Sequence, residues 1–257
     1  MRLPFHHSAP ARTLRKPAAT ELPSLQGASL AALYRAARMG GDFYDFTLLR
    51  GRLIFVLLDI AGKRDEALDI AAAVQEEFHG NSERLFRNTI MNEADALSEL
   101  TVALNRSIME EAQGVRCAPA FVGAYDEDLG TMFYINAGHT PALLKDQDGV
   151  QLLHANGLPL GLFSHATHDA QACVLMPGAS ALVVSKGLVE SRGGGRQEFG
   201  IERLQEGVNR ISFSSAGELC SGVLTAVEEF TKNNPGQNDI TTLALMRNVE
   251  VPVPAGT

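Results

Sequence analysis

Apolar residues follow two different periods along this chain, and their order predicts the fold class. Residues 53–58 form an uninterrupted apolar run, rich in branched and aromatic residues and bounded by turn residues, which indicates a buried strand. The segment before Arg50-Gly51 also looks extended, so we expect it to turn there and pair antiparallel with that strand. Further strands are predicted at residues 28–38, 120–125, 131–136, 141–145, 150–154, 172–175, 181–185 and 240–246. We expect 172–175 and 181–185 to pair with each other.

Helical spacing of apolar residues appears in stretches that come in two pairs. Residues 65–78 form the first, and His79-Gly80-Asn81 predicts its end. Further helical stretches are predicted at 83–113, with a break near 88–93, and at 201–211 and 216–232. Strands in antiparallel pairs and helices in separate pairs predict an α+β fold with the helices packed outside the sheets.

Composition narrows the class of protein. The chain has 257 residues, 45% of them apolar and 20% charged, and a formal charge of −8, which argues against nucleic-acid binding. Its three cysteines, Cys117, Cys173 and Cys220, form no C-x-x-C pair, which fits a reducing compartment. No apolar stretch is long enough to span a membrane, and the basic N-terminus lacks the apolar segment of a secretory signal, so we expect a cytoplasmic protein.

Domain boundaries are predicted as a disordered basic arm at 1–21, one domain at 22–248 and a disordered tail at 249–257.

Two aspartates flank the predicted hairpin. Asp42 precedes its first strand and Asp59 ends its second, so antiparallel pairing would bring them side by side. Two carboxylates held together at a sheet edge repel each other, and a hard divalent cation between them would relieve that repulsion. The alternative is that each aspartate only caps a turn or a loop.

Several short motifs in order resemble one known family. They are GGDFYD (40–45), DIAGK (59–63), NAGH (136–139), GLPLG (157–161), GLVE (187–190) and DIT (239–241). Together they resemble the PPM-type metal-dependent protein phosphatases, in their SpoIIE-like bacterial branch, from about residue 22 to residue 247. The resemblance implies a four-layer αββα sandwich, two antiparallel sheets flanked by helical pairs.

The resemblance also implies a reaction and its residues. In the family two Mn²⁺ or Mg²⁺ ions activate a water that hydrolyses phosphoserine or phosphothreonine. The ligand positions fall on Asp42, Asp59, Lys186 and Asn238, with the carbonyl of Ile60. Asp42 and Asp59 then carry catalysis, and Asp45 and Asp239 are candidate supporting residues.

Two of those four positions do not hold acids in this chain. Lys186 replaces an anion by a cation, and at about 4 Å and an effective dielectric near 20 a unit charge and a divalent ion interact by roughly 8 kcal/mol. Asn238 keeps an oxygen ligand but adds no charge. Four outcomes stay open: the metal site is lost and the domain only binds, one ion remains on Asp42 and Asp59, Lys186 meets the phosphate as a fixed cation, or Lys186 is a solvated loop residue. We therefore expect one metal ion or none.

The implied partner is a phosphorylated small regulatory protein of the anti-anti-sigma type, in a partner-switching circuit. The alternative is a catalytically inactive pseudophosphatase that acts as a protein-binding regulatory module. The resemblance further points to the helix after Asp59 as the place where relatives gate the metal site and form homodimers. His139 is expected to be a hydrogen-bonded structural residue rather than a general acid.

Overall fold

The computed structural model describes residues 15–37, 41–88, 92–194, 197–232, 236 and 238–249. Residues 1–14 of the predicted arm, Gly40 of the first motif and residues 250–257 of the predicted tail lie outside the described residues. Residues 15–21, expected in the disordered arm, are placed against the rest of the domain by the hydrogen bonds described below.

Ten strands and five helices alternate in groups along the described residues. The strands are β1 (Ala28–Arg35), β2 (Asp42–Leu49), β3 (Arg52–Asp59), β4 (Ala120–Asp126), β5 (Thr131–Ala137), β6 (Ala142–Asp146), β7 (Gly149–Leu153), β8 (Gln171–Val174), β9 (Ser180–Val184) and β10 (Ile240–Arg247). The helices are α1 (Arg64–Phe86), α2 (Glu93–Glu111), α3 (Lys186–Val189), α4 (Gly200–Arg210) and α5 (Ala216–Thr231).

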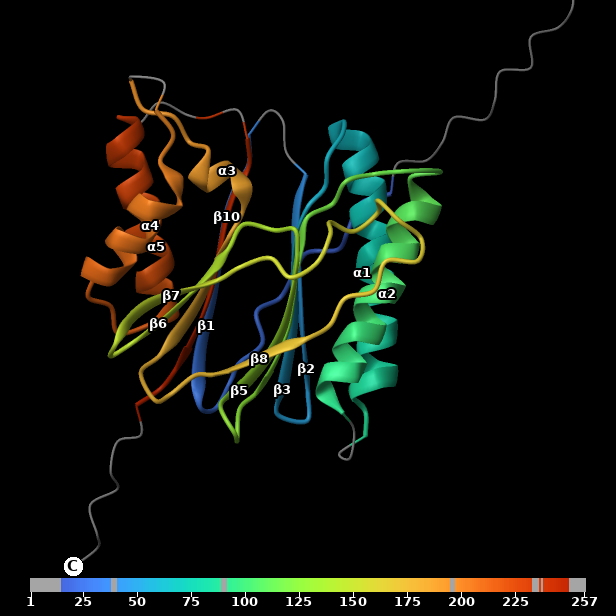
Figure 1. Cartoon of the computed structure of the whole chain (residues 1–257), viewed down its shortest axis with the longest axis horizontal. Coiled ribbons are helices and arrows are strands. Elements are labelled where there is room, and N and C mark those ends of the chain that lie inside the picture. The colour runs from blue at the N-terminus through green and yellow to red at the C-terminus, as the bar shows by residue number, and fades with distance from the viewer. Residues whose placement is uncertain are drawn as a thin grey trace, which may run out of the picture.

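The strands form two five-stranded sheets whose neighbours are all antiparallel. One sheet has the order β1-β10-β9-β6-β7 and the other β2-β3-β4-β5-β8. The sheets pack face to face, with α1 and α2 covering the outside of the second and α3, α4 and α5 covering the outside of the first (Figure 1). The predicted α+β, four-layer αββα sandwich is confirmed.

Strand β3 shows how the sequence produces these layers. Alternate side chains of a strand point to opposite faces, and both faces of β3 are covered. Leu53, Phe55 and Leu57 enter the cluster between the two sheets. Ile54, Val56 and Leu58 enter the cluster beneath α1 and α2. All six are at most 1% exposed, which is why the run is continuous rather than alternating.

The predicted end of the first helix at residues 79–81 is wrong, because α1 continues to Phe86. Phe78 and Phe86 are both fully buried, and their burial outweighs the cost of about 1 kcal/mol for a glycine within a helix. Asn81 also bonds within the helix, since its Nδ2 donates to the carbonyl of Glu77 at 3.2 Å. Tertiary packing therefore overrides the local stop signal.

The predicted pairing of 172–175 with 181–185 is also wrong. Strand β8 pairs with β5 in one sheet, whereas β9 pairs with β10 and β6 in the other. The five-residue connection between them, 175–179, carries the chain across the sandwich. Leu175 N donates to the Gly130 carbonyl at 2.8 Å, and Gly178 N donates to the Arg247 carbonyl at 2.9 Å. A short connection between two strands therefore does not form a hairpin here.

Among the described residues, no helix has both the length and the apolar character needed to cross a lipid bilayer.

His139 lies in the turn after β5 and is 3% exposed. Its backbone N–H donates to Asn136 Oδ1 at 2.8 Å, and its Nδ1 lies 3.2 Å from the Thr140 carbonyl. Burial lowers the pKa of His139 to about 4, against a weaker raising effect of the Thr140 carbonyl. The structural role expected for His139 agrees with these contacts.

The depressed pKa of His139 predicts a pH-dependent stability. A histidine that is neutral when folded contributes stability above its unfolded pKa of 6.5, and this contribution is lost as pH falls toward 4. Between pH 7 and pH 5, we expect the free energy of unfolding to fall by about 2 kcal/mol more in the unchanged protein than in His139→Gln. Urea unfolding at both pH values measures this difference. Exposed His154, changed to Gln, is the control. Equal pH dependence in His139→Gln and the unchanged protein would contradict the assignment.

Candidate functional site

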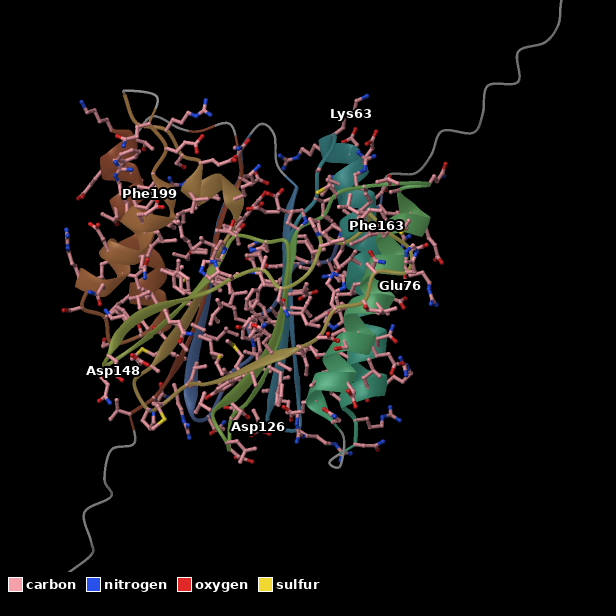
Figure 2. The ribbon with its side chains drawn as sticks, viewed as in Figure 1. Lys63, Glu76, Asp126, Asp148, Phe163 and Phe199 are labelled. Carbon is pink, nitrogen blue, oxygen red and sulfur yellow. The ribbon has the colours of Figure 1, made fainter. Side chains whose placement is uncertain are left out.

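The two aspartates of the first two motifs stand directly opposite each other. Asp42 begins β2, Asp59 ends β3, and the two residues are register partners. Residues 50 and 51 have φ angles of 53° and 77°, which gives the tight turn that joins the strands. Asp59 shares its strand face with Leu57, so both carboxylates belong to the face between the sheets. Figure 2 shows Lys63, four residues after Asp59, at one end of the sandwich, and Asp126, which pairs with Arg52 at the start of β3, at the opposite end.

Asp42 is tied to the other sheet through two hydroxyl groups. Thr241 Oγ1 in β10 donates to Asp42 Oδ2 at 2.6 Å, and the Ser185 hydroxyl also donates to this carboxylate. Burial raises the pKa of Asp42 to about 7, opposed by these two hydrogen bonds and assisted by the negative charges of Asp59 and Asp239. The contacts fix the carboxylate across the gap between the sheets.

Asp59 lies beside the one basic residue of the site. Burial raises the pKa of Asp59, the positive charge of Lys186 opposes this, and Glu190 and Asp239 add to it. Lys186 Nζ lies 3.0 Å from Oε1 of Glu190, the residue that follows α3, and the Lys186 side chain is 59% exposed. The hydrogen bond and charge of Glu190 raise the pKa of Lys186. Lys186 therefore belongs to a short helix and is ion-paired, while more than half of its side chain remains exposed to solvent.

These groups line one cavity of about 200 Å³. Its lining residues are Gly41, Asp42, Asp59, Ile60, Ala61, Gly62, Lys186, Gly187, Glu190, Asn238 and Asp239. The structure thus brings together Asp42, Asp59, Ile60, Lys186 and Asn238, residues that are up to 196 positions apart in sequence (238 − 42).

Two glycines of the motifs allow backbones to meet at this cavity. A Cβ on Gly41 would lie 2.0 Å from the Ile60 carbonyl oxygen, and Ile60 N donates to the Gly41 carbonyl at 2.9 Å. A Cβ on Gly187 would lie 2.0 Å from the Asp239 carbonyl oxygen. Side chains at these positions would push β2 away from β3 and α3 away from β10.

The two residues before β10 have different environments. Asn238 is exposed and lines the cavity. The buried carboxylate of Asp239 accepts from Tyr34 Oη and from the backbone N–H of Ala37, both at 2.6 Å. Both of its oxygens are thus held by protein donors, and Asp239 neighbours the site without offering a free carboxylate to it.

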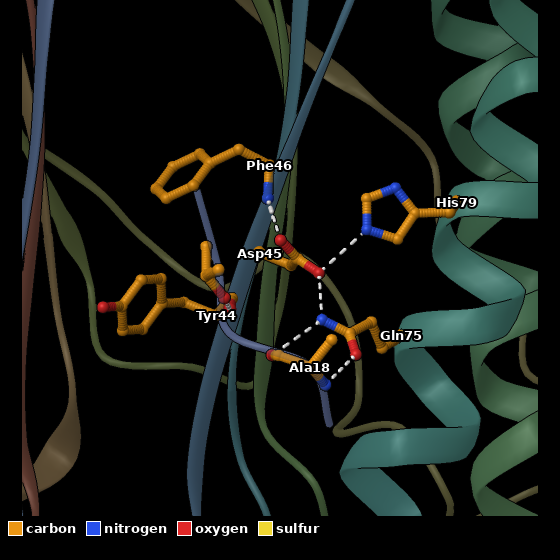
Figure 3. Close-up of polar contacts among 7 residues, drawn as sticks. Ala18, Tyr44, Asp45, Phe46, Gln75 and His79 are labelled. Carbon is orange, nitrogen blue, oxygen red and sulfur yellow. Dashed lines mark hydrogen bonds and ion pairs between the residues drawn. The ribbon is translucent and has the colours of Figure 1, made fainter. Parts of the chain in front are cut away.

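Asp45 does not reach the cavity. It is three positions after Asp42 on β2, so it points to the opposite face, toward α1. Its carboxylate, 2% exposed, accepts from Phe46 N at 2.8 Å and Gln75 Nε2 at 2.7 Å and lies 3.0 Å from His79 Nε2 (Figure 3). These contacts join β2 to the helix that begins shortly after Asp59.

The same side chain of Gln75 holds the chain before β1. Its Oε1 accepts from the backbone N–H of Ala18 at 2.7 Å, and its Nε2 donates to the Ala18 carbonyl at 3.3 Å (Figure 3). Arg15 continues the contact with α1, where its backbone N–H donates to Asp69 Oδ1 at 2.7 Å. Thr20 Oγ1 donates to the Tyr44 carbonyl at 2.9 Å, which attaches this segment to β2 as well.

Sequence reasoning missed four residues of this site: Tyr34, Ser185, Glu190 and Thr241. Ser185 and Thr241 flank ligand positions within recognised motifs, but nothing in a single sequence reveals that their hydroxyls bond to Asp42. The i, i+4 spacing of Lys186 and Glu190 was a readable signal of an ion pair, given a helix there.

The donor set does not match a site for two divalent ions. Such a site needs a ring of oxygen ligands carrying several negative charges. The described part of the chain contains no group of three or more His, Cys, Asp or Glu side chains arranged to hold a metal ion. Asp42 and Asp59 remain as candidate ligands, whereas Glu190 is bound by Lys186 and Asp239 by Tyr34 and Ala37.

The motifs and the sandwich are matched by known proteins. The family described as stage II sporulation protein E (SpoIIE) matches residues 50–248, which is most of the chain. The chain belongs to the SpoIIE family of phosphatase domains. Proteins of this phosphatase family depend on Mg²⁺ or Mn²⁺, and one structural neighbour, RsbX, was solved in complex with magnesium.

Curated relatives of this SpoIIE domain are longer proteins. Protein IcfG of Synechocystis sp. is 24% identical over 88% of this chain and 39% of its own length. Phosphoserine phosphatase RsbP of Bacillus subtilis is 23% identical over 70% of this chain and 44% of its own length. The chain thus spans less than half of either relative.

Solved structures share the fold. The RsbU and RsbW domains of a Mycobacterium tuberculosis protein match with a TM-score of 0.68 and 26% identity, covering 90% of this chain and 64% of that one. The phosphatase domain of SpoIIE from Bacillus subtilis matches with a TM-score of 0.66 and 17% identity, covering 90% and 96%. The SiaA-PP2C domain of Pseudomonas aeruginosa matches with a TM-score of 0.71 and 16% identity, covering 86% and 85%.

The position of Asp45 predicts a structural and not a catalytic role. Asp45→Ala removes hydrogen bonds to a buried charge and leaves the Gln75 amide without that acceptor, so we expect the free energy of unfolding to fall by about 2–4 kcal/mol in urea. Asp148→Ala, in the exposed turn after β6, should change stability by less than about 0.5 kcal/mol. A stability loss as small as that of the control would contradict the role given to Asp45.

Proposed function

We propose that this domain recognises a small regulatory protein of the anti-anti-sigma type through its phosphorylated serine or threonine, and hydrolyses that phosphoester only weakly. The observation that carries the second part is the ion pair of Lys186 with Glu190 in the cavity of Asp42 and Asp59. Membership of the SpoIIE family supports the first part, as do the names of two relatives, a phosphoserine phosphatase and a protein with RsbU and RsbW domains.

Each residue of the cavity has a proposed role. Asp42, Asp59 and the Ile60 carbonyl would ligate one Mn²⁺ or Mg²⁺ ion, and Asn238 would add a neutral oxygen. When bound, such an ion activates water and neutralises charge on the phosphoryl group. Lys186 places a positive charge where a further anionic ligand would be required, so this chain's residues favour one ion at most. The hydrogen bonds of Asp42 to Thr241 and Ser185 would orient it.

A double substitution tests the weakened metal site. In Lys186→Asp with Asn238→Asp, two anionic ligands replace a cation and an amide, so the cavity loses a repulsion and gains two attractions for a divalent ion. We expect Mn²⁺ affinity, measured by calorimetry, to rise at least about tenfold, equivalent to about 1.4 kcal/mol. Turnover of p-nitrophenyl phosphate should rise with it.

Two further variants make this test specific. Arg106→Glu with Asn209→Asp changes the net charge equally at exposed positions outside the cavity and should leave Mn²⁺ affinity unchanged. Asp59→Ala in the double variant should abolish the gained turnover. Unchanged affinity in the Lys186→Asp, Asn238→Asp protein would count against this ligand set, and turnover by the unchanged chain that equals the double variant would count against weak hydrolysis.

A further inference from the structure

The segment between α2 and β4 borders the strand end that carries Asp59. Ala61, which lines the cavity, donates its backbone N–H to the Cys117 carbonyl at 3.1 Å. On the other side of this segment, Arg116 N donates to the Gly161 carbonyl at 3.0 Å. Because its neighbours bond the segment on both sides, the backbone of Arg116 has a fixed position beside the cavity.

The side chain of Arg116 packs against Gly62, another residue that lines the cavity. A Cβ on Gly62 would lie 2.7 Å from Arg116 Nη1, so the glycine leaves the room that the guanidinium occupies. Arg116 Nη2 donates to Glu66 Oε2 at 2.8 Å, and the Arg116 side chain is 27% exposed. The guanidinium is therefore oriented by an ion pair at the rim of the cavity, where a bound molecule can still reach it.

The ion pair with Glu66 leaves two nitrogens of the Arg116 guanidinium without an acceptor among the described residues. Nε is one of them and is buried, which costs stability and is rare for a group with only a structural role. Nη1 is the other and is not buried, so it can donate to a molecule at the mouth of the cavity. Because Glu66 would repel a second carboxylate, a neutral oxygen is the better acceptor for Nη1. Main-chain carbonyls are neutral acceptors that every protein carries.

We infer that Arg116 Nη1 donates to a main-chain carbonyl beside the phosphorylated residue of the partner, so that the domain favours phosphoproteins over small phosphoesters. The inference rests on the proposed function, since a phosphorylated residue in the cavity brings its flanking main chain to this rim. Val115 precedes Arg116 and is 69% exposed, and Phe163 lies two residues after Gly161 and is 49% exposed. These side chains add apolar surface to the rim, and arginine and aromatic residues are enriched at protein interfaces.

Two phosphonates that the domain cannot hydrolyse test the inference on the full chain. One is a capped peptide with three alanines on each side of the phosphonate analogue of phosphoserine. The other is ethylphosphonate, which has no main chain. By calorimetry in millimolar MnCl₂, we expect the unchanged protein to bind the peptide at least about tenfold more tightly than ethylphosphonate. In Arg116→Ala this ratio of affinities should fall to about twofold or less, because the donor to the main chain is lost.

Arg116→Lys keeps the positive charge and the pairing with Glu66 but has no second nitrogen, so its ratio should fall as that of Arg116→Ala does. Arg84→Ala is the matched control and should keep the ratio of the unchanged protein. Arg84 Nη2 also pairs with a glutamate, Glu99 at 2.7 Å, but Arg84 lies near the other end of α1. A ratio taken within one variant does not depend on the fraction of protein that is folded.

The inference is overturned if Arg116→Ala or Arg116→Lys keeps the ratio of the unchanged protein. Equal affinity of the unchanged protein for the two phosphonates overturns the inference alone and agrees with the proposed function. Failure of the unchanged protein to bind either phosphonate overturns both. Should Arg116→Ala fail to fold, Arg116→Lys decides between these outcomes.

Discussion

The register of one hairpin determines the chemistry of this domain. Once β2 and β3 pair with Leu49 opposite Arg52, Asp42 must lie opposite Asp59 seven residues further along each strand. A register shift by one residue would move every side chain of β3 to the opposite face of the sheet and disrupt both apolar clusters. The packing of these two clusters therefore holds the carboxylates together. The energy for this comes from burial of apolar side chains between the sheets and under α1 and α2.

The sheet that contains β9 and β10 supplies the groups that contact Asp42. Thr241 lies at the start of β10, and Ser185 directly follows β9 and is hydrogen-bonded to Thr241, on the side of the sandwich that faces β2 and β3. Both donate to Asp42, and Lys186 follows Ser185 directly. Strand ends from both sheets therefore contribute to a single site. The distance between the sheets determines which side chains can contact each other across the gap.

Strand parity explains how much of this the sequence could predict. The pairing of Asp42 with Asp59 follows from a two-residue turn between two strands of equal length. Asp45 is three residues after Asp42 on the same strand, so its side chain lies on the opposite face. The fold class followed from helical and strand periods and from ordered motifs. The bonds of Tyr34 and Thr241 could not be predicted, because they join residues about 200 positions apart whose distance depends on the packing of complete layers. The same limit explains the helix end misplaced at residue 80 and the supposed pairing of β8 with β9, where buried phenylalanines and a crossing turn outweighed local signals.

Gln75 recognises the segment before β1 by its main chain alone, because it bonds the N–H and the carbonyl of Ala18 and no side-chain atom. Any residue that keeps its backbone N–H would satisfy Gln75 at that position, whereas proline would not. The attachment of this segment to α1 is thus insensitive to most sequence change at residue 18. Residue 18 can therefore vary widely while the segment stays bonded to the helix that follows Asp59.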